Sequence, residues 1–352
     1  MWDLQQTLIN DLSEHVRDVQ NLLTPDVKGL RMVKGYEIPM YSHPYRVKCN
    51  LQLRSWLKRY CFADDIFTPE QRSVLTDEKF LSDQVRIGQG LPMSHRSYLV
   101  VQKARKLIKS VLGTYNEEQI YPHCQFSRKA VVGFSGDNIY LDDKIHPGSV
   151  ISGTASEVKW FDNYLKSDPI LKDLLKDRHS GNVNYRVITS LAQVNVAKNA
   201  SIMRPVRPNT LIGSFRSSGL AGVVEEALPM LGIRINVQQE IHKRLARAGS
   251  RRGHNATMDL SSASDSFTPS LMNRLLPRDW YNAFKLGRTP YVELRTLGTT
   301  IYSPSFMAMG IGYTFALMTL CYQAILLSIQ DLAQIKGRIS TFGDDLIFPK
   351  GM

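Results

Sequence analysis

Apolar side chains recur at helical spacing in several stretches of the chain. In the first, leucines and valines lie three or four residues apart from Leu4 to Leu23, which predicts a helix over residues 4–23. The same reasoning predicts helices over residues 100–112, 156–175, 221–232 and 237–248. Residues 132–153 are instead rich in turn-forming residues and predict short strands or loops.

Shorter apolar runs predict strands. Residues 339–342 and 346–348 flank Gly343-Asp344-Asp345, a sequence typical of the turn of a hairpin. Residues 256–260 form a further short strand that ends near Asp259, and a helix is expected to follow it over residues 269–276. Residues 183–196 predict a pair of strands.

One long apolar segment lies near the end of the chain. No charged residue occurs between Arg295 and Asp331, and residues 306–329 are strongly apolar. Its length would allow a membrane span. However, Gly310 and Gly312 open the segment, and threonine, glutamine and serine side chains interrupt it. We therefore expect a loop that leads into a fully buried helix, and no membrane association.

Length and charge narrow the range of functions. A chain of 352 residues predicts two or three subdomains, and an apolar content of 43% is ordinary for a globular protein. The net charge is +12, and residues 186–255 contain 11 Lys and Arg against three Glu. This segment is either a solvated surface or a contact for nucleic acid, and its closeness in sequence to the acidic motifs favours nucleic acid.

The cysteines and the N-terminus exclude several classes of protein. The four cysteines have no paired spacing, so neither a zinc site nor a disulfide framework is indicated, and a reducing cytosol fits. The first residues are polar and acidic, without the basic and apolar regions of a signal peptide.

Acidic side chains in two motifs suggest a metal site. Asp344 and Asp345 are adjacent in the predicted turn, and two close carboxylates ionise together readily only if a cation lies between them. Magnesium prefers such oxygen ligands, although an Asp-rich surface turn would look the same. In the second motif, serines separate Asp259 at a strand end from Asp265, which could equally cap the next helix.

If the strands that carry Asp259 and Asp344 end side by side, their carboxylates could hold two cations. That arrangement supports in-line phosphoryl transfer. The order along the chain is an acidic strand, a glycine loop with a buried helix, and an acidic hairpin. This is the order of motifs A, B and C in palm-domain polymerases.

Three segments resemble motifs of the replicases of single-stranded RNA bacteriophages, the levivirus group typified by phage Q-beta. Residues 258–266, Met-Asp-Leu-Ser-Ser-Ala-Ser-Asp-Ser, are similar to motif A of that family. Residues 309–315, Met-Gly-Ile-Gly-Tyr-Thr-Phe, resemble its motif B, and residues 342–345, Phe-Gly-Asp-Asp, resemble its motif C. Upstream, Lys198-Asn199 followed by Arg204 resembles a basic element of the family.

The resemblance implies an α+β right-hand polymerase with fingers and a partial palm, whose antiparallel sheet packs against helices and whose thumb is missing. It implies an RNA-directed RNA polymerase that replicates a phage single-stranded RNA genome by two-metal nucleotidyl transfer. Residues 1–185 would be an unassigned, fingers-like region, residues 186–257 a basic fingers segment, and residues 258–352 the partial palm.

The resemblance also implies roles for the acidic residues. Asp259, Asp344 and Asp345 would be the catalytic residues and the ligands of two Mg²⁺ ions, with Mn²⁺ as a possible substitute. Asp265 would help to sense the ribose 2′-hydroxyl, the group by which a protein distinguishes RNA from DNA.

Further implied roles concern the substrates and partners. Lys198 and Arg204 would hold the incoming nucleoside triphosphate, and Gly310 and Thr314 in the motif B loop would bind substrate. The partners implied are the RNA template, nucleoside triphosphates, and the host elongation factors Tu and Ts with a ribosomal protein. The implied location is the cytoplasm of a bacterial host.

The chain also departs from the family pattern. Ile311 stands where the family has Asn, and Met307-Ala308 stand where it often has two serines, so polar contacts from this loop are missing. The chain stops seven residues after Asp345, which is expected of a truncated polymerase. A catalytically inert RNA-binding fragment is therefore an alternative. A reverse transcriptase is another, against which the serine-rich motif A argues.

Overall fold

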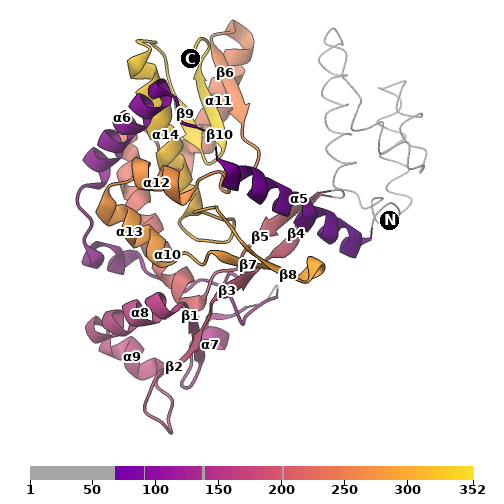
Figure 1. Ribbon diagram of the computed structural model, residues 1–352. Coiled ribbons are helices and arrows are strands. Elements are labelled where there is room, and N and C mark those ends of the chain that lie inside the picture. The colour runs from indigo at the N-terminus through magenta and orange to yellow at the C-terminus, as the bar shows by residue number, and fades with distance from the viewer. Residues whose placement is uncertain (1–67, 91, 137–138, 200–201) are drawn as a thin grey trace, which may run out of the picture. The chain divides into compact units, whose positions relative to one another are not determined.

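The computed structural model describes residues 68–90, 92–136, 139–199 and 202–352 (Figure 1). The predicted helix over residues 4–23 lies outside these residues. Two compact units divide the chain. The larger comprises Leu81–Val194 and Val206–Met352, and the described part of the smaller comprises residues 68–80, 195–199 and 202–205. These compact units do not test the functional division at residues 186 and 258, which stays a prediction.

The smaller unit combines the first turns of helix α5 (Pro69–Gln89) with strands β4 (Val194–Asn199) and β5 (Ile202–Val206), which pair with each other. The amide of Asn195 on β4 joins the strand to the helix. Its Nδ2 donates to the hydroxyl of Ser73 at 2.8 Å and to the carboxylate of Asp77 at 2.7 Å. Because Asp77 is buried, these hydrogen bonds satisfy a carboxylate that would otherwise be costly to enclose.

Helices make up most of the larger unit. Those of the first half, besides the second half of α5, are α6 (His95–Leu112), the 3₁₀ helix η2 (Glu117–His123), α7 (Leu141–Lys144), α8 (Ala155–Ser167) and α9 (Pro169–Leu175). Those of the second half are α10 (Leu211–Ala227), η3 (Leu228–Leu231), α11 (Ile235–Arg252), α12 (Pro269–Leu275), α13 (Arg278–Leu286), η4 (Arg295–Leu297) and α14 (Thr314–Leu332).

Three small sheets complete the larger unit. Strands β1 (Val150–Gly153) and β2 (Asn184–Val187) pair in parallel. Strand β7 (Tyr291–Leu294) lies between β3 (Ser190–Ala192), to which it is parallel, and β8 (Thr299–Tyr302), to which it is antiparallel. The third sheet is antiparallel and has the order β6 (Asn255–Asp259), β10 (Asp345–Pro349), β9 (Ser340–Phe342). Helices and mainly separate sheets together make an α+β architecture.

Helix α14 is the centre of the core. It packs against α6 and α10, and one hydrophobic cluster joins side chains of all three (Figure 1). By length and composition α14 could cross a membrane, and it is the one helix among the described residues that could. Its apolar side chains are mostly buried against the other helices. The predicted helix behind a glycine loop is thus confirmed, but it is mostly and not fully buried.

Three helix and strand predictions were wrong in detail. The helix predicted over residues 221–232 begins earlier, at Leu211, and its α-helical part ends at Ala227. The helix predicted over residues 156–175 is broken into α8 and α9, because Pro169 disfavours helical geometry at Asp168, whose carboxylate then caps α9. The strand pair predicted over residues 183–196 is not a hairpin. Strands β2 and β3 instead join different sheets, each through a parallel partner that is distant in sequence.

Candidate active site

Asp259 and Asp345 lie directly opposite each other in the three-stranded sheet. Strands β6 and β10 are antiparallel, and their register pairs Asp345 with Asp259, followed by Leu346 with Met258. Residues opposite each other in an antiparallel pair have Cα atoms roughly 5 Å apart. The structure therefore brings together two carboxylates that are 86 residues apart in the sequence.

The third acid, Asp344, lies in the turn between β9 and β10. Gly343 and Asp344 form a two-residue loop, and Gly343 has a φ of +65°, a conformation that glycine adopts without strain. The N–H of Gly343 donates to the hydroxyl of Thr319 on α14 at 3.0 Å. The predicted hairpin is confirmed, except that Asp345 begins the second strand and is not part of the turn.

The carboxylates influence one another electrostatically. The pKa of Asp345 is raised, first by partial burial and then by the negative charges of Asp344 and Asp259, while His242 opposes the shift. His242 lies on α11, which packs against this sheet, and burial lowers its own pKa. Its Nε2 is buried with no hydrogen-bond partner among the described residues. The acids therefore form a coupled cluster that a bound cation would stabilise.

The donor set fits a hard divalent cation. Three carboxylates supply the oxygen ligands that magnesium and manganese prefer. In the described part of the chain, no group of three or more His, Cys, Asp or Glu side chains already surrounds one metal position. Asp259, Asp344 and Asp345 thus lie near one another without forming a closed coordination shell.

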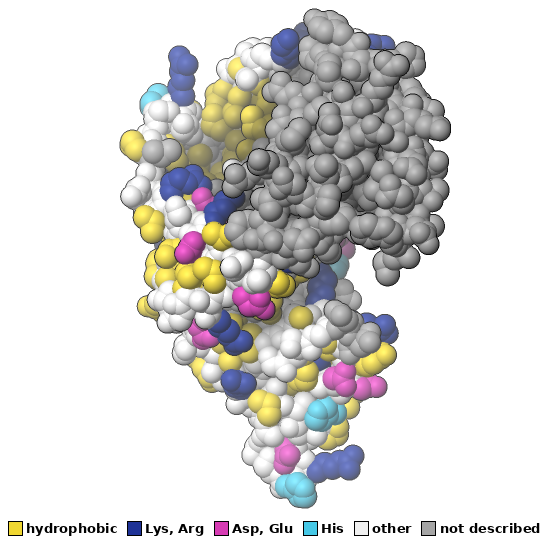
Figure 2. Space-filling model, turned by 90° about the vertical axis from the view of Figure 1, so that its right-hand side faces the viewer, with side chains coloured by type: hydrophobic (Ala, Val, Ile, Leu, Met, Phe, Trp, Pro, Cys, Tyr) yellow, Lys and Arg dark blue, Asp and Glu magenta, His cyan; other side chains and the backbone are white. Residues whose placement is uncertain are grey.

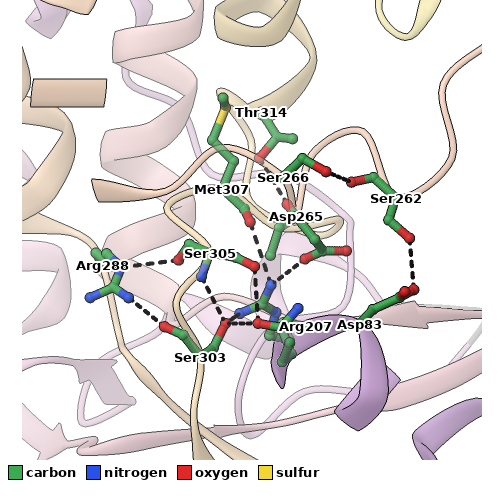
Figure 3. Close-up of polar contacts among 12 residues, drawn as sticks. Asp83, Arg207, Ser262, Asp265, Ser266, Arg288, Ser303, Ser305, Met307 and Thr314 are labelled. Atoms are coloured by element: carbon green, nitrogen blue, oxygen red, sulfur yellow. Dashed lines mark hydrogen bonds and ion pairs between the residues drawn. The ribbon is translucent and has the colours of Figure 1, made fainter. Parts of the chain in front are cut away.

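A serine-rich loop follows Asp259 and is held by side-chain hydrogen bonds (Figure 3). Ser262 has a φ of +50°, and its hydroxyl donates to the carboxylate of Asp83 on α5 at 2.9 Å. The hydroxyl of Ser266 donates to the carbonyl oxygen of Ser262 at 2.9 Å. The small serines allow the loop to turn sharply and to lie against α5.

Asp265 is buried in this loop and forms an ion pair with Arg207. The Nη2 atom of Arg207 lies 2.8 Å from Oδ1 of Asp265, and both side chains are almost inaccessible to solvent (Figure 3). Burial raises the pKa of Asp265, while the Arg207 guanidinium acts in the opposite direction. Asp265 does not cap α12, because Thr268 does so by accepting a hydrogen bond from the Leu271 N–H.

Arg207 also holds the loop that precedes α14. Its guanidinium donates to the hydroxyl of Ser303 at 3.2 Å and to the carbonyl oxygen of Met307 at 3.4 Å. Its backbone N–H donates to the carbonyl oxygen of Met309 at 2.8 Å. One arginine thus joins the serine-rich loop to the glycine loop, and its residue type allows several hydrogen bonds at fixed angles.

Gly310 and Thr314 shape the glycine loop. Gly310 has a φ of +103°, and a β-carbon there would overlap the carbonyl oxygen of Arg207. The hydroxyl of Thr314, the first residue of α14, donates to the carbonyl oxygen of Ala308 at 2.8 Å. In this structure both residues have local structural functions, and their predicted substrate contacts stay predictions.

Lys198 and Arg204 are exposed residues of the smaller unit, on the paired strands β4 and β5. The three acids lie in the larger unit, and the predicted triphosphate contacts of Lys198 and Arg204 stay predictions. Three residues of the site were not singled out from the sequence. Arg207 had been counted only as one of many cations, and Asp83 and His242 lie in helices whose sequences carry no motif.

Comparisons with known proteins connect this arrangement to a family. The profile of the family described as RNA replicase, beta-chain, matches residues 70–352. The RNA-directed RNA polymerase beta chain of Enterobacteria phage fr is 31% identical over 251 residues, which cover 70% of this chain and 44% of the relative. The corresponding chain of Escherichia phage MS2 is 28% identical over the same share of each chain.

A third relative shows a shorter but closer match. The RNA-directed RNA polymerase subunit beta of Enterobacteria phage SP is 35% identical over 162 residues, 46% of this chain and 28% of that protein. The chain therefore spans less than half the length of these curated relatives. Among solved structures, an insertion-loop deletion mutant of the RNA-dependent RNA polymerase of a human picobirnavirus matches 94% of this chain and 66% of its own, at 14% identity and with a TM-score of 0.42.

Proposed function

The chain belongs to the RNA replicase beta-chain family, and from that premise we propose that it carries the catalytic acids of an RNA-directed RNA polymerase. The observation that carries the proposal is the register of β6 and β10, which sets Asp345 opposite Asp259 with Asp344 in the adjoining turn. In this assignment residues 258–352, which include α14, β9 and β10, belong to the partial palm, and residues 186–257 belong to the fingers.

The proposed reaction joins a nucleotide to the 3′ end of an RNA strand. The 3′-hydroxyl oxygen attacks the α-phosphorus of a nucleoside triphosphate, a new phosphodiester bond forms, and pyrophosphate leaves. Asp259, Asp344 and Asp345 would hold two Mg²⁺ ions, which when bound lower the pKa of the hydroxyl and neutralise the leaving group. Mn²⁺ has the same ligand preference and could replace Mg²⁺.

Roles for the other predicted residues follow from their positions. Lys198 and Arg204 have exposed side chains that could bind triphosphate oxygens. Asp265 could contact a ribose hydroxyl only through an oxygen that Arg207 leaves accessible, because Arg207 already binds Oδ1. We therefore propose that Asp265 acts on the ribose mainly by positioning its loop, and less by direct contact.

The proposed substrates are an RNA template and nucleoside triphosphates. The proposed location is the cytoplasm of a bacterial host. The relatives are named beta chains, which implies that each is a subunit of a complex. Elongation factors Tu and Ts and a ribosomal protein are the proposed partners, by resemblance to the phage replicases. Figure 2 shows Lys and Arg side chains interspersed with Asp and Glu side chains on the described part of one face.

Asp344→Asn tests this function. Incorporation of labelled nucleotide into a primed RNA template should be lost, while RNA affinity measured by fluorescence anisotropy should be retained, because the substitution removes one ligand charge at constant shape. Asp142→Asn is the matched control, since Asp142 is an exposed aspartate on the short helix α7. RNA binding without incorporation by the unchanged chain would favour the inert RNA-binding fragment. Incorporation from deoxynucleotides would favour a reverse transcriptase.

A further inference from the structure

A cavity of about 520 Å³ lies in the larger unit, and none of the three acids of the candidate active site lines it. Its walls come from the start of α8, the connection between β2 and β3, and the segment that joins α13 to β7. The polar lining residues include Ser156, Thr189, Lys285, Arg288 and Thr289. No Asp or Glu is among the lining residues, so the cavity has a positive character.

Several hydrogen-bond donors in this cavity are available to a ligand. Ala155 and Ser156 are the first two exposed residues of α8, and backbone N–H groups at this position have no partner within the helix. The side chain of Lys285 is also exposed. N–H and ammonium donors at one cavity suit the oxygens of a phosphate group.

The guanidinium of Arg288 adds a charge in a fixed position. Its Nη2 donates to the carbonyl oxygen of Ser303 at 2.6 Å and its Nε donates to that of Ser305 at 3.1 Å. The same guanidinium lies over the ring of Tyr302, 5.6 Å from the ring centre. An anchored cation of this kind attracts an anion without any loss of side-chain freedom on binding.

Two exposed aromatic rings adjoin the cavity. Tyr291, which lines it, is 50% exposed, and Tyr302, its cross-strand partner on β8, is 58% exposed. The two ring centres are 6.0 Å apart in an edge-to-face arrangement. Proteins that bind single-stranded nucleic acid often place exposed aromatic rings beside their phosphate contacts, because an unpaired base can stack on such a ring.

We propose that this cavity and the Tyr291–Tyr302 pair form a docking site for single-stranded RNA, separate from the catalytic acids. A phosphodiester group occupies the cavity, where Lys285 and the N-terminus of α8 bind its oxygens. A neighbouring base stacks on Tyr291. The choice of RNA over another polyanion rests on the proposed function, whereas the phosphate chemistry rests on the cavity itself.

The test uses the full chain and a 5′-labelled oligouridylate RNA, with affinity measured by anisotropy over a range of salt concentrations. Lys285→Gln should weaken binding and lower the slope of log K against log salt by about 0.7, the value for one phosphate contact to a single strand. Tyr291→Ala should weaken binding roughly fivefold or more without changing the slope. Lys285→Arg and Tyr291→Phe should retain affinity. Lys159→Gln, at an exposed lysine of α8 outside the cavity, is the matched control.

A second measurement does not depend on affinity. The same RNA substituted with 5-iodouridine should crosslink under ultraviolet light to a peptide that contains Tyr291 or Tyr302. Crosslinks confined to other peptides, together with equal effects of Lys285→Gln and Lys159→Gln, would overturn the proposal. Competition by inorganic phosphate that Lys285→Gln abolishes, without any effect of Tyr291→Ala, would show a site for free phosphate or nucleotides and would exclude RNA docking.

The outcome is separable from that for the proposed function. If the unchanged chain incorporates nucleotides and binds RNA, but the cavity variants bind it equally well, only the docking site is wrong. If the unchanged chain binds no RNA at all, both proposals are wrong.

Discussion

Asp345 faces Asp259 across the β6–β10 strand pair, and the negative charges of Asp259 and Asp344 raise the pKa of Asp345. Like charges directly opposite each other destabilise a sheet by up to about 1 kcal/mol. Repulsion between these carboxylates therefore destabilises the end of a short sheet that is otherwise well paired. A bound cation would turn this repulsion into attraction, which makes the cluster's response to metal and to pH measurable without any assay of activity.

The first prediction concerns metal. Mg²⁺ should raise the unfolding temperature of the unchanged chain, because a ligand that binds only the folded state stabilises it. The gain is about 1.4 kcal/mol when free Mg²⁺ is about tenfold above its dissociation constant. Asp345→Asn should remove most of this gain, and Asp142→Asn should leave it intact. Differential scanning fluorimetry with and without Mg²⁺ provides the measurement, and an equal gain in all three proteins would place the ion elsewhere.

The second prediction concerns pH without metal. Because the pKa of Asp345 is raised in the folded state, the folded state binds its proton more tightly than the unfolded state does. This residue's contribution to stability should therefore decrease as the pH rises from the ordinary Asp pKa of about 4 through the raised value. Asp345→Asn should be relatively more stable above that window.

The difference in unfolding free energy between the unchanged chain and Asp345→Asn reports the titration of Asp345 separately from that of other groups. Urea unfolding of both at a series of pH values between about 4 and 7 would give the difference in unfolding free energy. A difference that stays constant across this range would show that Asp345 is not coupled to its neighbours. Mg²⁺ should reduce the pH dependence, since the cation competes with the proton for the carboxylate.

The third prediction concerns the buried pair of Arg207 and Asp265. Arg207→Met leaves the Asp265 carboxylate buried without its cation, which typically costs about 3–5 kcal/mol in unfolding free energy. The double variant Arg207→Met, Asp265→Leu should recover much of this loss, because no uncompensated charge remains. Arg207→Lys should be intermediate, since it keeps the charge and loses the planar fork. Urea unfolding of the unchanged chain, Arg207→Met, Asp265→Leu and the double variant forms a double-mutant cycle, and additive losses would contradict direct coupling.

Local signals in the sequence predicted the parts of the site that depend on neighbouring residues. The hairpin around Gly343 and the strand that ends at Asp259 followed from turn residues and short apolar runs, and both are present. The helix over residues 269–276 was predicted to within one residue of α12. In each case the chemistry that decides the structure lies within a few residues along the chain.

Long-range pairings could not be predicted in the same way. Arg207 and Asp265 are separated by 58 positions, and neither their residue types nor their spacing indicates that they meet. Residues 183–196 were predicted to form a pair of strands, but β2 and β3 each pair in parallel with a distant strand. A parallel strand pair has no hairpin turn that could be recognised in the sequence, because a long crossover connection joins its two strands.

The fourth prediction concerns the contact between Gly310 and Arg207. At a φ of +103°, any side chain at Gly310 would be strained, and its β-carbon would also overlap the carbonyl oxygen of Arg207. That oxygen belongs to the backbone and cannot rotate away. The glycine loop would have to move from Arg207, which would break the hydrogen bond from the Arg207 N–H to the Met309 carbonyl oxygen.

Gly133 provides a matched control, because its φ is +94° and no atom lies within 4 Å of a β-carbon built there. Gly133→Ala should lose about 1 kcal/mol of unfolding free energy through backbone strain alone. Gly310→Ala should lose about twice as much or more, since steric overlap adds to the same strain. Urea unfolding compares the two variants directly. Equal losses would mean that the glycine loop adjusts freely, and that Arg207 does not hold it in the position seen here.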